Sequence, residues 1–362
     1  MWAIALKEFR QVRRDHRLVA LMVVMPVVML VVFGYAASFD VGDIRTVVTG
    51  PQAERLAAQL PEQLDVTAVR PADGREQARQ ALVDGDDMVA VVTGGPADRP
   101  LVLVDGSQLF AARAVQTAIA QRAASAPAGT PQPQVEILFN PTLDTSVVMV
   151  PGLMGVVLVF VGTLVTSLGV VRERQAGTLE QLAVMPFKPR DVVIGKVAPY
   201  FLVAIFDMAL IVVAGLVLFG VPFNGSPLLF ALASALFLLV TLGVGVLVST
   251  VSQNQGQAVM LALMTLMPQI LLSGLIFPVE AMAAGVRWIA YLLPLKYFID
   301  IARGVLLRGA GFEALWMPLT MLAILGVLVF GLAIARFRRD LAPRIPSEPA
   351  EAEPALAQAG AR

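Results

Sequence analysis

The feature that most constrains this chain is a series of six apolar runs, each about as long as a helix that crosses a lipid bilayer. A membrane-crossing α-helix needs about 20 mainly apolar residues, because the hydrocarbon core is about 30 Å thick and a helix rises about 1.5 Å per residue. The sequence therefore predicts an α-helical polytopic membrane protein with six transmembrane helices. The runs cover residues 18–37, 147–171, 197–219, 228–251, 257–277 and 315–335.

The composition excludes most enzyme chemistry. The chain has no cysteine and one histidine, His16, which removes disulfides, thiol nucleophiles, zinc–thiolate sites, histidine metal clusters and Ser-His-Asp triads. Lys and Arg together number 27, the same as Asp and Glu, so no excess of charge points to nucleic acid. We expect no enzymatic activity, no metal site and no bound cofactor in this chain.

The distribution of Lys and Arg predicts the orientation. Five precede the first span, five lie between the second and third, and five follow the sixth. Because cytoplasmic loops are rich in Lys and Arg, we expect both termini to be cytoplasmic, and a multi-pass protein of a bacterial inner membrane. Residues 40–146 carry eight Arg against fourteen Asp and Glu, which indicates an extracytoplasmic segment.

Within residues 40–146 the pattern changes to short alternating runs between helical ones, which predicts a small α/β domain inserted between the first and second spans. The predicted division is 1–39 for an interfacial helix and the first span, 40–146 for this domain, 147–340 for the remaining spans, and 341–362 for a disordered tail. Asp105, Gly106 and Ser107 are interpreted as a turn.

Residues 278–312 are too apolar for a solvated loop. Pro294 divides them into two amphipathic pieces of roughly 12–16 residues, each too short to span the membrane comfortably, which predicts external re-entrant helices. Trp288, Tyr291 and Tyr297 are expected at the lipid headgroup boundary.

A short amphipathic helix is predicted at about 174–186, between the second and third spans. Thr178 is a suitable N-cap, Leu179 and Leu182 share one face, and Pro186 ends the helix. From these residues alone, the helix either stabilises the loop or docks on a partner.

Several segments resemble the permease subunits of the type 2 ABC exporter (ABC-2) superfamily, in its multidrug-efflux-like group with a large external domain after the first span. The resemblance extends from Lys7 to Phe337. It is carried by Asn140-Pro141 with Met149 to Leu153, Arg172-Glu173 with Gly177 to Leu182, Gly195 to Tyr200, Pro268 to Glu280, and Pro294 to Phe298 with Arg303-Gly304.

The resemblance implies that the short helix is a coupling helix, which fits a groove on a separate ABC ATPase subunit that binds ATP and Mg. It further implies export of a hydrophobic or amphipathic drug, lipid or lipid-linked molecule by two copies of this chain, or by this chain with a paralogous permease. It leaves a periplasmic adaptor open. The implied coupling residues are Glu173, Arg174, Gly177, Thr178, Leu179, Glu180, Leu182 and Pro186.

Three polar residues inside the spans are candidates for the translocation pathway or the dimer interface. Asp207 is an ionisable residue in the third span, and Gln269 and Ser273 lie one helical turn apart in the fifth. Hydrogen bonding between helices is the simpler interpretation of all three.

The sequence disfavours two other classes of function. An ABC-linked mechanotransmission protein would act on a periplasmic partner without transporting a substrate, but six spans and a domain without sustained heptads disfavour it. A membrane-embedded enzyme is disfavoured by the missing catalytic residue types.

Overall fold

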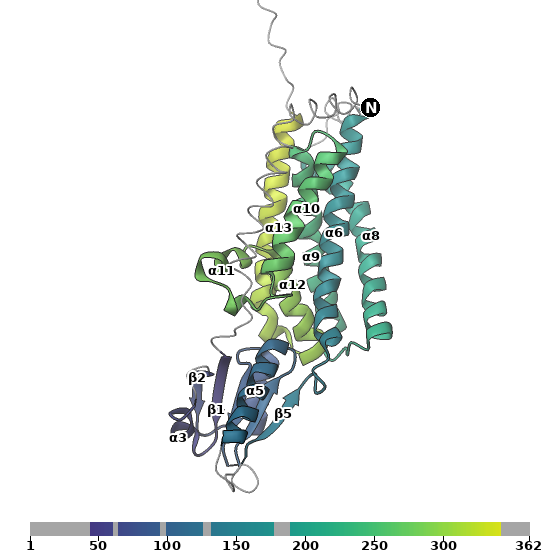
Figure 1. The fold of residues 1–362 in the computed structure, drawn as a ribbon. Helices are drawn as coiled ribbons and strands as arrows, with labels where there is room; N and C mark the ends of the chain where they lie inside the picture. The colour runs from purple at the N-terminus through teal and green to yellow at the C-terminus, as the bar shows by residue number, and fades with distance from the viewer. Residues whose placement is uncertain (1–43, 61–63, 95–98, 126–131, 177–188, 342–362) are drawn as a thin grey trace, which may run out of the picture.

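The computed structural model describes residues 44–60, 64–94, 99–125, 132–176 and 189–341. An α/β unit lies against one end of a bundle of long helices, the end at which α6 begins (Figure 1). The predicted first span at 18–37 and the predicted tail at 342–362 lie outside the described residues.

The α/β unit contains a five-stranded mixed sheet with the order β2-β1-β3-β4-β5. β1 pairs in parallel with β2 and β3, β3 is antiparallel to β4, and β4 is parallel to β5. The described elements are β1 (Ile44–Thr49), α3 (Ala53–Ala57), β2 (Leu64–Arg70), α4 (Arg75–Asp84), β3 (Val89–Val92), β4 (Leu101–Asp105), α5 (Leu109–Ser125) and β5 (Gln134–Leu138).

Both faces of the sheet are apolar, because successive apolar side chains of each central strand point to opposite faces. Val47, Ala90 and Leu103 pack with α4 on one face, whereas Val48 and Val89 pack with α5 on the other. Successive side chains of a strand point to opposite faces, so a strand buried on both sides reads as a continuous apolar run. Helices therefore cover both faces of the sheet.

Five described helices are long and apolar enough to cross a membrane. The first predicted span is outside the described residues, so the total of six stays a prediction. The five helices are α6 (Thr145–Gln175), α8 (Pro189–Phe219), α9 (Pro227–Val251), α10 (Gln255–Leu272) and α13 (Phe312–Leu341).

α6 and α9 form the centre of the bundle. In their most apolar windows 56% and 61% of residues are buried, against 17% in α8 and in α13. Small residues bring the two central helices together: a Cβ atom added at Gly245 would lie 2.8 Å from the main-chain oxygen of Thr163, and one added at Gly162 would lie 3.0 Å from Oγ1 of Thr241. Close backbone approach at small residues is how helices associate in membranes, where burial from water supplies no driving force.

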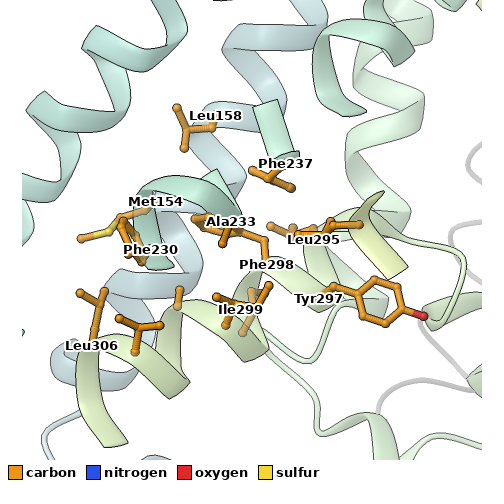
Figure 2. Close-up of a cluster of buried hydrophobic side chains, with 14 of the residues drawn as sticks. Met154, Leu158, Phe230, Ala233, Phe237, Leu295, Tyr297, Phe298, Ile299 and Leu306 are labelled. Atoms are coloured by element: carbon orange, nitrogen blue, oxygen red, sulfur yellow. The ribbon is translucent and has the colours of Figure 1, made fainter. Parts of the chain in front are cut away.

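The segment predicted as re-entrant helices folds as four short pieces, and Pro294 is the first residue of the third, as expected for a proline at the start of a helix. The third piece, α12, is buried between α6, α9 and α13, where Phe298 and Leu295 lie among apolar side chains (Figure 2). The pieces are η2 (Val279–Ala281), α11 (Ala284–Ala290), α12 (Pro294–Arg303) and the π-helical η3 (Gly304–Arg308).

The aromatic residues of this segment separate into two environments. Trp288 and Tyr291 are 59% and 48% exposed, as a headgroup position requires. Tyr297 differs from the expectation: it is 4% exposed, and its hydroxyl donates to the main-chain oxygen of Tyr291 at 2.7 Å. Lys296 Nζ lies 5.0 Å from the centroid of the Tyr297 ring and 5.1 Å from that of Tyr291, so the ammonium group helps to cover both rings.

Candidate coupling and translocation site

The last turn of α6 is bonded to the end of α9. Nη1 of Arg174 donates to the main-chain oxygens of Ser249 and Ser252, both at 3.1 Å. The last carbonyls of a helix have no partner within the helix, and a nearby cation is stabilising there. One residue further on, Gln255 Nε2 donates to Gln175 Oε1 at 3.0 Å. The last residues of α6, from which the chain continues into the predicted coupling segment, are therefore hydrogen-bonded to both α9 and α10.

The predicted coupling residues divide between described and undescribed parts of the chain. Glu173 is half-buried in the last turn of α6, and Arg174 faces α9. The contacts of Arg174 give it a role inside the bundle, which the sequence did not indicate. The other six lie outside the described residues, so their role stays a prediction: Gly177, Thr178, Leu179, Glu180, Leu182 and Pro186.

Asp207 lies on α8 at the border between its packed and exposed faces. It is half-buried, next to exposed Phe206 and buried Met208. Within the described part of the chain, no hydrogen bond or ion pair reaches its carboxylate. An ionisable group in a span is costly and usually faces a partner or a water-filled path.

Gln269 and Ser273 are 4% and 1% exposed, at the end of α10 that faces the other helices. Gln269 Nε2 donates to the main-chain oxygen of Thr265 at 3.4 Å. Among the described residues, Gln269 Oε1 and Ser273 Oγ have no hydrogen-bond partner. Both side chains are buried within this chain, and their role in the pathway or at the dimer interface stays a prediction.

Arg303, at the end of α12, is a buried cation, and the sequence indicated it only as part of the family resemblance, with no role of its own. It is 9% exposed, and its guanidinium donates to the main-chain oxygens of Val148 at 3.4 Å and Gly274 at 3.3 Å. It thereby joins the start of α6 to the turn after α10. The signal in the sequence was a basic residue inside the apolar run at 299–307.

The turn at residues 105–107 is the place where the α/β unit meets the helices. Asp105 Oδ1 accepts from the main-chain N–H of Ser107 at 2.8 Å, and Asp105 Oδ2 lies 3.7 Å from Nη1 of Arg308 in η3. The Asp105 and Arg308 side chains are 1% and 8% exposed. The predicted turn is therefore also a buried contact between two parts of the fold.

Electrostatics at this contact are governed by burial. Loss of hydration raises the pKa of Asp105 above its usual range, because the charged form is disfavoured away from water. The Arg308 guanidinium offsets part of this cost, followed by the hydrogen bonds from Ser107. Breaking one partner of such a pair leaves the other charge buried without compensation.

The described geometry defines a class of protein: a multi-pass helical membrane protein with an α/β unit attached to one end of its bundle. The family model described as "ABC-2 family transporter protein" matches residues 16–335. The chain belongs to this family.

Two curated permeases match nearly the whole chain, and a third matches part of it. It is 28% identical to "Probable multidrug ABC transporter permease YbhS" of Escherichia coli (strain K12), over 94% of this chain and 97% of the relative. It is also 28% identical to "Probable multidrug ABC transporter permease YbhR" of the same strain, over 94% and 99%. "Inner membrane transport permease YhhJ" of that strain is 32% identical over 58% of this chain and 56% of the relative.

Proposed function

We propose that this chain is the membrane-spanning permease subunit of an ABC exporter, driven by a separate ATPase subunit. The single observation that carries the proposal is the link between Arg174 and the end of α9, together with the family membership. A permease needs a rigid connection from the surface that its ATPase moves to the helices that open and close. The hydrogen bonds of Arg174 and Gln175 provide such a connection at the start of the predicted coupling helix.

The proposed substrate is a hydrophobic or amphipathic molecule. The names of two relatives refer to multidrug transport. In the central parts of the five described spans, at 147–171, 197–219, 228–251, 257–272 and 315–335, Asp207 is the one charged residue. Two permease copies, or this chain and a paralogue, would enclose the pathway. The orientation follows the distribution of Lys and Arg, with the α/β unit outside the cytoplasm in a bacterial inner membrane.

The first experiment is affinity purification of the tagged chain from gently solubilised native membranes, with identification of the co-purifying proteins. We expect a P-loop ATPase in stoichiometric yield and ATP hydrolysis that vanadate inhibits. Absence of any ATPase in several detergents would contradict the proposal.

A variant tests the coupling helix itself. Leu179→Arg with Glu180→Arg places positive charge on the predicted docking face, so the ATPase should no longer co-purify, while the permease still inserts into the membrane. The matched control is Glu76→Arg in α4 of the α/β unit, where the side chain is 78% exposed. Equal recovery of the ATPase with both variants would contradict the assignment of the coupling helix.

A further inference from the structure

Hydrogen bonds and a buried ion pair connect the α/β unit to the helix bundle. We name the polar residues of this contact the junction cluster: Asp105, Gly106, Ser107, Asn140 and Arg308. Gly106 donates its N–H to the main-chain oxygen of Leu138 at 2.9 Å. Asn140 Nδ2 donates to the oxygens of Gly106 at 3.4 Å and Asp144 at 3.1 Å. The connection from β5 into α6 is therefore bonded to the turn after β4.

Gly106 has no room for a side chain. A Cβ atom there would lie 2.7 Å from the main-chain oxygen of Leu138 and 2.8 Å from that of Asn140. Protein interiors are packed closely enough that such contacts cannot relax without moving backbone. The close approach of the two main-chain oxygens explains why a glycine occupies the centre of the turn.

Arg308 makes the connection from the helix bundle. Besides Asp105, its guanidinium faces Gly85, which ends α4 in a left-handed conformation with φ of 82°. A Cβ atom at Gly85 would lie 2.6 Å from Nη1 of Arg308. The side chain is thus enclosed by the ends of β4 and α4, inside the α/β unit.

The segment that carries Arg308 is itself fixed to the bundle. Asn224, in the connection between α8 and α9, bonds the main-chain oxygens of Leu306 and Leu307 through its own N–H and its side-chain amide, at 3.1 and 2.7 Å. Apolar contacts extend the joint, because Val83 of α4 and Leu109 of α5 belong to the same buried cluster as the residues of α12 and η3.

From this geometry we propose that the junction cluster makes the α/β unit one rigid body with η3 and the start of α13. Movement of this part of the bundle during the transport cycle then carries the unit with it. The first statement concerns the permease alone, and the second rests on the proposed transport function.

The chain suits a direct test because it contains no cysteine. Cysteines introduced at Ala118 in α5 and at Glu313 in α13, both exposed, accept spin labels without competition. Pulsed electron–electron double resonance on the purified permease then gives the distribution of distances between the spin labels at positions 118 and 313, which lie on either side of the junction cluster. We expect one narrow population.

Asp105→Asn keeps the shape of the side chain but removes its charge, and should at least double the width of that distribution. The matched control is Arg75→Gln, which breaks an ion pair with Glu136 of 2.7 Å that lies within the α/β unit. The control should leave the width unchanged. If the distance distribution of the Asp105→Asn variant is no wider than that of the chain without this substitution, the proposal is overturned.

Arg308→Gln breaks the same contact from the bundle side and replaces Asp105→Asn if that variant does not fold. The double variant should be no broader than either single one, because both remove one interaction. Additive broadening would show that the two side chains act separately and would overturn the proposal.

The second statement is tested in the complex with the ATPase. Trapping with ATP and vanadate should leave the distance between positions 118 and 313 unchanged. A shift in that distance larger than its resting width would show that the unit moves independently, which overturns the rigid-body proposal. Failure to isolate any ATPase would contradict the proposed function while the result on the permease alone still stands.

Discussion

The aromatic ring of Phe298 is stacked on that of Phe237, with centroids 4.3 Å apart and planes 18° from parallel. Phe237 belongs to α9 and Phe298 to α12, and both side chains are fully buried (Figure 2). The contact fixes the short helix α12 to the centre of the bundle.

Phe298→Ala should therefore be strongly destabilising. Removing a buried aromatic ring leaves a cavity that its neighbours fill only in part, and we expect a loss of roughly 3–5 kcal/mol. The measurement is the free energy of unfolding in mild detergent. Phe206→Ala is the control, since that ring is 68% exposed on α8. Similar losses at the two positions would show that the stack contributes nothing specific.

Gly245→Ala should separate α6 from α9. The new methyl group would lie 2.8 Å from the main-chain oxygen of Thr163, and overpacking of this kind costs about 1–3 kcal/mol. Gly331→Ala in α13 is the control, because no atom lies within 4 Å of its Cβ position. The control measures the helix-propensity gain of about 1 kcal/mol by itself. A variant at 245 that is as stable as the control would refute close packing there.

Arg174→Ala should uncouple the permease from its ATPase without releasing it. The variant loses both hydrogen bonds to the end of α9, while the predicted docking face stays intact. We expect several-fold lower substrate-stimulated ATP hydrolysis at unchanged co-purification. Arg172→Ala, at an exposed position two residues earlier, should retain the stimulation. Loss of co-purification with Arg174→Ala would instead assign this residue to the docking surface.

Asp87 should make the stability of the α/β unit depend on pH. Burial raises its pKa above the ordinary value of 3.8, although the hydrogen bond from Thr67 and the charge of Arg45 oppose the shift. The folded protein then holds the proton more tightly than the unfolded chain, so this contribution to stability is lost as pH rises from about 3.8 through the folded pKa. Above that interval the contribution stays constant.

The measurement compares the unfolding of the unsubstituted protein with that of Asp87→Asn across this range. Their difference in stability should change in favour of the variant as pH rises. A difference that is independent of pH, or one that changes in the opposite direction, would be incompatible with the raised pKa.

Asp207→Asn should have opposite effects on stability and on transport. Removing a charge that has no partner in the described part of the chain should raise the free energy of unfolding. If the carboxylate serves the pathway, substrate-stimulated ATP hydrolysis should fall. Unchanged transport together with unchanged dimer stability would show that this residue has neither proposed role.

The long elements of the fold could be predicted because one physical constraint determines each. Every predicted run from 147 onwards lies on one long helix, since an apolar run of this length has few alternatives. The exception in extent is the run at 257–277, because α10 already ends at Leu272. The strands Ile44–Thr49 and Leu101–Asp105 also lie where β-branched alternation indicates them. The pattern gives no strand order, so the antiparallel pairing of β3 with β4 could not be deduced.

The contacts of the site were less accessible to sequence reasoning. The family resemblance implies a coupling role for Arg174, whereas its hydrogen bonds depend on where α9 ends, which no local pattern indicates. Asp105 was assigned to a turn, which is correct locally. Its burial arises from Arg308, about two hundred residues later in the chain, and no local pattern carries that information.

The position of Arg303 has a consequence for the way α10 ends. An 18-residue helix is roughly 27 Å long, shorter than the hydrocarbon layer that it would have to cross. The turn that follows must find hydrogen bonds where solvent is scarce, and the Arg303 guanidinium supplies one to Gly274. The Arg303 side chain thus provides a hydrogen bond that water would otherwise have to provide, and so allows the backbone to leave the helical state inside the fold.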